Sequence, residues 1–185
     1  MSNPATIAPV KVVDYDPDWP RIFQRLRDQI WPSLQDAALA IEHVGSTAVK
    51  GMAGKPVIDL DVVISSRTQL PVVTARLETL GYKQRGNLGI DDREAFAPPT
   101  DQPAHHLYVC SRNSLSLRNH ITVRDYLRTH RSQAIVYSNL KKQLAERFSN
   151  QREFYGKGKT DFILSILKQC EFSAEELDSI KCAQV

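Results

Sequence analysis

The sequence predicts an α+β fold, in which a mixed sheet of four or five strands carries helices and is followed by a C-terminal helical lobe. Two observations lead to this prediction. Short β-branched segments and amphipathic helical segments are interspersed as far as residue 112, and beyond it the apolar spacing is helical throughout. The 185 residues suit a single domain. We therefore expect one body, 1–185, with a core at about 16–112 and a basic lobe at about 113–182 packed on it.

The first predicted element is a helix. Asp16 and Pro17 are typical of an N-cap and a first turn, and apolar residues then recur at helical spacing until Trp31 and Pro32. Two strands should follow, at 40–44 and 57–64, because both segments are short and rich in β-branched residues.

The middle of the core should contain one helix and three strands. Ser66 is placed to cap the helix and Gly81 to end it. A strand at 82–85 and a long-looped hairpin complete the sheet. The hairpin strands are expected at 94–97 and 106–110. In the lobe, the spacing predicts helices over about 117–127, 135–148 and 159–170, and a short one after Ser173.

Composition indicates a soluble, unexported protein of the reduced cytoplasm. No apolar run approaches the roughly 20 residues that a membrane helix needs, and the amino terminus has no leader pattern. Three widely spaced cysteines build neither a disulfide framework nor a zinc site. Residues 118–159 hold ten Lys or Arg against three acids, a charge of +7. That segment is either a solvated surface or the binding face of an anionic partner.

Asp59 and Asp61 are the strongest candidates for a functional site. They alternate with apolar residues on a predicted strand, so both carboxylates should project from one face into one cleft. Two neighbouring carboxylates repel unless a cation neutralises them, and hard oxygen ligands suit Mg²⁺ or Mn²⁺. We therefore expect an Asn substitution at either position to abolish metal binding without lowering thermal stability. The alternative is a half-buried strand whose polar face meets water.

A glycine-containing turn precedes this strand. Gly45, Ser46 and Thr47 follow the strand at 40–44, where backbone N–H groups and the serine hydroxyl can hold a phosphate at the mouth of the cleft. Lys55 either reaches that phosphate or is solvated. It does not belong to a Walker A motif, because Val49 stands at the required first glycine and Pro56 follows the lysine.

These residues resemble the signature of the nucleotidyltransferase superfamily, hG[GS] followed by h[DE]h[DE]h. Val44-Gly45-Ser46 and Ile58-Asp59-Leu60-Asp61-Val62 fill it in order. The chain as a whole resembles the GrpB-like family. The segments that carry this resemblance are HVGSTAVKGMAGKPVIDLDVVI at 43–64, His106-Leu107, VRDYLR at 123–128, and the Tyr137/Lys141 and Tyr155/Lys159 segments.

The resemblance implies a nucleotidyltransferase-like fold. The family resemblance does not settle the activity. We expect the phosphates of a nucleoside triphosphate to lie on Gly45-Ser46 and Mg²⁺ (or Mn²⁺) to bind Asp59 and Asp61, with a nucleotidyl group passing to an unknown acceptor. Active members of the superfamily usually have a third carboxylate on a neighbouring strand, which 106–110 lacks; relatives also often have histidine where Tyr108 stands. Asp91, Asp92 or Glu94 can substitute. The alternative is a catalytically inactive nucleotide-binding or regulatory module.

The basic lobe supplies further phosphate-binding candidates. Tyr137 with Lys141, and Tyr155 with Lys159, each share a helical face. We expect an exposed Lys141 or Lys159, or else Arg124, to reach across the cleft, with the tyrosines holding the helices in place. RNA binding is a weaker hypothesis, because the lobe contains no RNA-recognition motif.

Several histidines have alternative interpretations. His43 and His106 can face the pocket as phosphate donors or be structural. His105, His106 and Cys110 do not form a zinc site, because successive strand residues point in opposite directions. His120 and His130 are each followed by a pattern similar to the paired His-x-Thr/Ser motif of two-histidine phosphoesterases. However, they are ten residues apart in a predicted helix and therefore lie on different faces of it.

Overall fold

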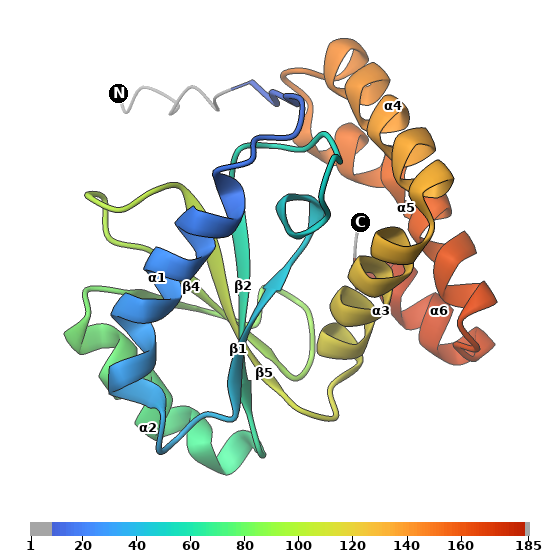
Figure 1. The fold of residues 1–185 in the computed structure, drawn as a ribbon. Helices are drawn as coiled ribbons and strands as arrows, with labels where there is room; N and C mark the ends of the chain where they lie inside the picture. Colours follow the sequence, from blue (N-terminus) through green and yellow to red (C-terminus); the bar gives the residue numbers. More distant parts are fainter. Residues whose placement is uncertain (1–8, 184–185) are drawn as a thin grey trace, which may run out of the picture.

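The computed structural model describes residues 9–183, which form a mixed α/β core followed by a helical lobe (Figure 1). The elements are α1 (Trp19–Leu34), β1 (Ala40–Val44), the 3₁₀ turn η1 (Ser46–Ala48), β2 (Ile58–Ile64), the 3₁₀ turn η2 (Arg67–Gln69), α2 (Leu70–Thr79), β3 (Lys83–Gly86), β4 (Arg93–Ala97), β5 (His105–Ser111), α3 (Leu115–Thr129), α4 (Arg131–Arg147), α5 (Arg152–Gln169) and α6 (Ala174–Ala183). The predicted α+β class is confirmed. Within the described residues, no helix has the length and apolar character needed to cross a membrane.

The five strands form one mixed sheet in the order β1-β2-β5-β4-β3. Strands β2 and β5 are parallel, and the remaining neighbours are antiparallel. The expected hairpin is therefore present as β4 and β5. Register places Asp59 beside Val44 on β1 and beside His106 on β5, and places Asp61 beside Glu42 and Tyr108. Because paired residues share a face, these side chains lie on the same side of the sheet.

The opposite face of the sheet contains the main core. Helices α1 and α2 cover it (Figure 1) and pack their apolar faces on inward-pointing strand residues. Examples of these buried residues are Leu26, Ile30, Leu60, Leu77 and Leu107. This packing holds β2 rigidly, and Asp59 and Asp61 project from its other side.

The helical lobe, α3–α6, lies on the face that carries the aspartates (Figure 1). The loop between β1 and β2 supplies Val49 and Met52 to an apolar cluster with Leu127, Tyr137 and Ile166 of the lobe. One hydrophobic cluster therefore joins this loop to three helices and fixes the lobe over the sheet.

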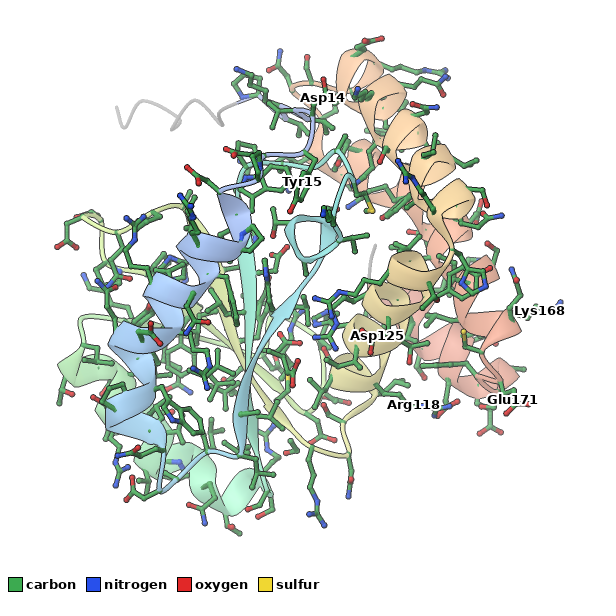
Figure 2. The ribbon with its side chains drawn as sticks, in the orientation of Figure 1. Asp14, Tyr15, Arg118, Asp125, Lys168 and Glu171 are labelled. Atoms are coloured by element: carbon green, nitrogen blue, oxygen red, sulfur yellow. The ribbon has the colours of Figure 1, made fainter. Side chains whose placement is uncertain are left out.

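Residues 10–14, which precede α1, also connect the helical lobe to the segment between β1 and β2. Val10 N–H donates to the carbonyl of Ser149, in the turn that follows α4 (2.6 Å), and Val13 exchanges backbone hydrogen bonds with Gly54. The ammonium of Lys142 lies 2.6 Å from the carboxylate of Asp14, which Figure 2 shows in this segment.

Several predicted boundaries were wrong, including both ends of α1. Helix α1 begins at Trp19 with Asp18 at the N-cap, and the Asp16 side chain accepts a hydrogen bond from Asp18 N–H (2.9 Å). The helix also continues through Pro32 to Leu34. Ser66 precedes the turn η2 and makes no capping hydrogen bond.

Helix α5 is longer than predicted, because it begins at Arg152 and includes two glycines. A Cβ on Gly158 would lie 2.4 Å from Leu144 Cδ2. The glycine therefore allows α5 to pack closely on α4, and this contact outweighs the low helix propensity of glycine.

Candidate functional site

A pocket of about 330 Å³, here called the main pocket, lies between the sheet and the lobe. Its lining includes most of the residues expected from the sequence. These are Gly45, Ser46, Lys55, Asp59, His106, Arg124, Tyr137, Lys141, Tyr155 and Lys159. The structure thus brings together residues from the segment between β1 and β2 and from β2, β5, α3, α4 and α5.

Asp59 and Asp61 share a face but differ in environment. Asp59 lines the main pocket, and its Oδ1 lies 2.9 Å from His106 Nδ1. Asp61 is fully buried beneath His120, whose Nδ1 lies 2.7 Å from Asp61 Oδ2. The second oxygen of Asp61, Oδ1, has no hydrogen-bond partner among residues 9–183. Only Asp59 opens directly into the pocket.

His120 has a raised pKa. Burial alone would lower it, but the charge of Asp61 and the hydrogen bond to it more than compensate. Contact with Asp61 therefore favours the protonated form of the histidine. Each carboxylate thus has a histidine partner, His106 for Asp59 and His120 for Asp61.

Gly45 is required by the geometry of the turn. Its φ is +70°, and a Cβ at this position would lie 2.2 Å from Asp59 Oδ2. Ser46 begins the turn η1 and lines the pocket. Thr47, in contrast, is buried away from the pocket, with its hydroxyl 2.9 Å from His43 Nε2.

His43 is part of the structural support rather than of the pocket lining. Its ring stacks on Phe23 with centroids 4.5 Å apart, and burial lowers its pKa to about 4. The imidazole is neutral at pH 7, so it does not supply a cation to a phosphate.

Lys141 was expected to be exposed, and this was wrong: only 2% of the residue is exposed. Its ammonium donates to Ser46 Oγ (2.6 Å) and to the carbonyl of Ala53, and lies 4.8 Å from the ring centroid of Tyr137. Burial, followed by repulsion from Lys159, lowers its pKa to about 7. The lobe helix α4 thus inserts a lysine into the glycine turn.

Two more lysines lie on the ring of Tyr155. Lys159 Nζ is 4.7 Å and Lys55 Nζ 5.7 Å from its centroid. Burial and then repulsion from Lys55 lower the pKa of Lys159 to about 8, and burial also lowers that of Lys55. Three lysines therefore converge beside the single lining carboxylate, Asp59. An anion placed among them would relieve their mutual repulsion.

Arg124 lines the pocket but is already engaged in ion pairs. Its guanidinium lies 2.6 Å from a Glu42 carboxylate oxygen and 2.7 Å from one of Asp125, and donates to the carbonyl of His43. We therefore assign Arg124 chiefly to holding α3 against β1.

Several polar residues of the pocket wall were not assigned to the site from the sequence, among them Arg93, Tyr108 and His120. His120 precedes Arg124 by one helical turn, so the face that carries Arg124 also carries His120. Arg93 lies 4.4 Å above the ring of Tyr108. Burial, followed by the charge of Asp59, raises the pKa of Tyr108 to about 12.

None of the proposed substitutes for a third carboxylate reaches the main pocket. Glu94 faces away from it and pairs with Arg67 (3.2 Å). Asp91 and Asp92 line a different cavity. Within residues 9–183, no three His, Cys, Asp or Glu side chains are arranged as ligands of one ion.

Comparison with solved structures defines the class of fold. The crystal structure of the conserved protein GrpB from Enterococcus faecalis matches with a TM-score of 0.77 at 29% identity, over 92% of this chain and 99% of that one. The Cid1 poly(U) polymerase with MgGTP bound matches with a TM-score of 0.52 at 14% identity, over 72% of this chain and 44% of that one. The fold is nucleotidyltransferase-like.

The family is also clear. Residues 9–169 match the model of the GrpB family, described as GrpB protein, and the chain belongs to this family. UPF0157 protein BH1888 of Halalkalibacterium halodurans is 31% identical over 88% of this chain and 83% of its own length. UPF0157 protein YqkA of Bacillus subtilis is 29% identical over 83% of this chain, which spans only 45% of YqkA.

Proposed function

We propose that the main pocket binds a nucleoside triphosphate and that the protein transfers its nucleotidyl group to an acceptor. The observation that carries this proposal is the convergence of Lys55, Lys141 and Lys159 beside Asp59, in the pocket that the Gly45-Ser46 turn also lines. A triphosphate carries several negative charges, and charge-assisted hydrogen bonds from lysine are suited to bind them. The nucleotidyltransferase-like fold supports the same assignment.

Asp59 and Asp61 would hold a divalent ion. The fit is supported by the unpartnered Oδ1 of Asp61, and by the preference of Mg²⁺ for one or two carboxylates together with substrate phosphates. When bound, such an ion neutralises charge that develops on the phosphates. Among the protein's own residues, Lys141 and Ser46 would position the phosphates. The half-buried His120 and the Arg124 ion pairs would keep β2, β1 and α3 in register.

A second candidate function is a nucleotide-binding module without catalysis. One observation favours it: the residues of β5 that face Asp59 and Asp61 are His106 and Tyr108, neither of which is an acid. Under this alternative, the lysines bind nucleotide in the same way and no transfer follows.

One experiment separates the two functions. The protein is incubated with each of the four NTPs and Mg²⁺ or Mn²⁺, and pyrophosphate release and nucleotide binding are both measured. The transferase predicts binding and pyrophosphate release, with the nucleotidyl group passing to water or to the protein itself when no other acceptor is present, and release lost in Asp59→Asn. The module predicts binding alone, and the absence of binding to all four NTPs would contradict both.

A further inference from the structure

A second cavity, of about 390 Å³, adjoins the main pocket. The two share part of their lining, namely Arg93, Asn119 and His120. The second cavity is otherwise formed by the loop before β4 and by residues of α3 and α6. Ligands in the two cavities would therefore both contact these three residues, here called the shared wall.

Arg93 is the distinctive residue of this wall. It is 9% exposed, and its Nε has no hydrogen-bond partner among the described residues. The acids on either side of it, Asp92 and Glu94, lie 3.8 and 3.2 Å from Arg67 instead. The guanidinium rests on the ring of Tyr108 (4.4 Å), which does not neutralise it. A buried cation without a counter-ion is costly, and an anionic ligand would compensate it.

The remaining lining suits a small polar ligand. Ser116, Ser179 and Asn119 offer hydroxyl and amide groups, while Leu115 and Ile180 are apolar. Asp91 and Asp92 also line the cavity, but both are exposed. Their charges are screened by water, whereas that of Arg93 acts at low dielectric, so the inner end of the cavity favours an anion.

We infer that the second cavity binds the acceptor of the proposed transfer, and that this acceptor presents a phosphate monoester to Arg93. This inference rests on the proposed function. One phosphate oxygen of the acceptor attacks the α-phosphorus of the nucleotide, and a new P–O bond forms. The bond from that phosphorus to the oxygen bridging to the β-phosphate breaks, and pyrophosphate leaves with the electron pair.

An acceptor of this class explains why the part of the lining shared by the two cavities, Arg93, Asn119 and His120, contains no carboxylate. A phosphate dianion is already a nucleophile, so no proton has to be removed from it. An acidic side chain beside it would repel it, whereas Arg93 attracts it. His106 and Tyr108 opposite the aspartates are compatible with such an acceptor.

The test is titration of inorganic phosphate, monitored by ¹H–¹⁵N NMR, into protein saturated with Mg²⁺ and a non-hydrolysable α,β-methylene NTP analogue. We expect phosphate to bind while the analogue remains bound, with shifts at the amides of Ser116 and Ser179. Arg93→Met should weaken phosphate binding by about tenfold or more, as expected for loss of a charge-assisted hydrogen bond. The exposed Arg112→Met is the matched control and should change nothing.

A second variant, Ser179→Tyr, is used in case Arg93→Met does not fold. Ser179 is an exposed residue of α6 that lines the second cavity, so a tyrosine there should fill the cavity. It should block phosphate binding and leave the analogue bound. The inference is overturned if phosphate only competes with the analogue, or if both variants bind phosphate like the parent. If no NTP analogue binds, the proposed function fails by itself. Phosphate binding is then compared between the Lys141→Met variant and the Lys141→Met/Arg93→Met double variant. Loss of phosphate binding in the double variant supports an anion site at Arg93, and unchanged binding refutes it.

Discussion

The ammonium of Lys141 donates a 2.6 Å hydrogen bond to the hydroxyl of Ser46, although 95 residues separate them. One residue begins the turn after β1 and the other lies in the middle of α4. This contact connects the lobe to the glycine turn and brings a buried cation to the place where we propose that phosphates bind.

Nucleotide binding should consume protons. The pKa values of Lys141 and Lys159 are lowered to about 7 and 8, and a bound polyanion favours their protonated forms. Affinity should therefore fall as pH rises from 7 to 9, by at most about tenfold per pH unit for each lysine. Calorimetry at pH 8 in two buffers of different ionisation enthalpy should show net proton uptake, which Lys141→Met reduces. Zero uptake would contradict the assignment of these lysines to the phosphates.

The same lysines affect the stability of the free protein with a definite sign. Between pH 7 and about 10.5, the unfolded chain holds protons on Lys141 and Lys159 that the folded protein has released. Their contribution to the free energy of unfolding therefore rises with pH over this range. Denaturant titrations of the parent and of Lys141→Met should show a weaker rise in the variant. Parallel curves for the two proteins would rule out a buried Lys141 with a lowered pKa.

Gly45→Ala should damage the site through a steric clash. The new Cβ would lie 2.2 Å from Asp59 Oδ2, so the carboxylate must move, and Mn²⁺ binding should be lost. Gly51→Ala is the matched control. Gly51 has a similar φ of +79°, but no atom lies within 4 Å of the point that its Cβ would occupy, so it shares the backbone strain without the clash. Mn²⁺ titration of both variants checks this, and equal affinities would indicate that Asp59 does not hold the metal.

Asp61→Asn should cost more stability than Asp59→Asn, because it leaves His120 without its carboxylate. Removing one partner of a buried hydrogen-bonded pair costs about 1–3 kcal/mol, or roughly 2–4 °C in Tm per kcal/mol in a domain of this size. The stabilisation from His120 is present below pH 6.5 and is lost as pH rises through its raised pKa. The difference in Tm should therefore be larger at pH 6 than at pH 9. A pH-independent difference would show that His120 is not the charged partner of Asp61.

Much of the site could be predicted from local pattern. Strand alternation places Asp59 and Asp61 on one face, and the Gly45-Ser46 turn follows directly from its position between two strands. Burial could not be predicted in this way. Asp61 is covered because α3 lays His120 over it, and Lys141 is covered because Ser46 and Ala53 come from a loop about 90 residues away.

His120 shows the limit of reasoning within one helix. The helical wheel separates it from His130 but does not show that its face meets β2. That information lies in the tertiary packing of α3 on the sheet, where Leu117 joins Val63 and Cys110 in one cluster.

The most direct test of the central claim is calorimetric titration of each NTP with Mg²⁺ into the parent, Lys141→Met and Lys142→Met. The adjacent Lys142 is half-exposed and pairs with Asp14, so it serves as the matched control. We predict that the parent and Lys142→Met bind one nucleotide equally. Lys141→Met should bind it about 1–3 kcal/mol more weakly, with a larger difference at low salt. A parent that binds none of the four NTPs, or a Lys141→Met variant that binds like the parent, would contradict the account.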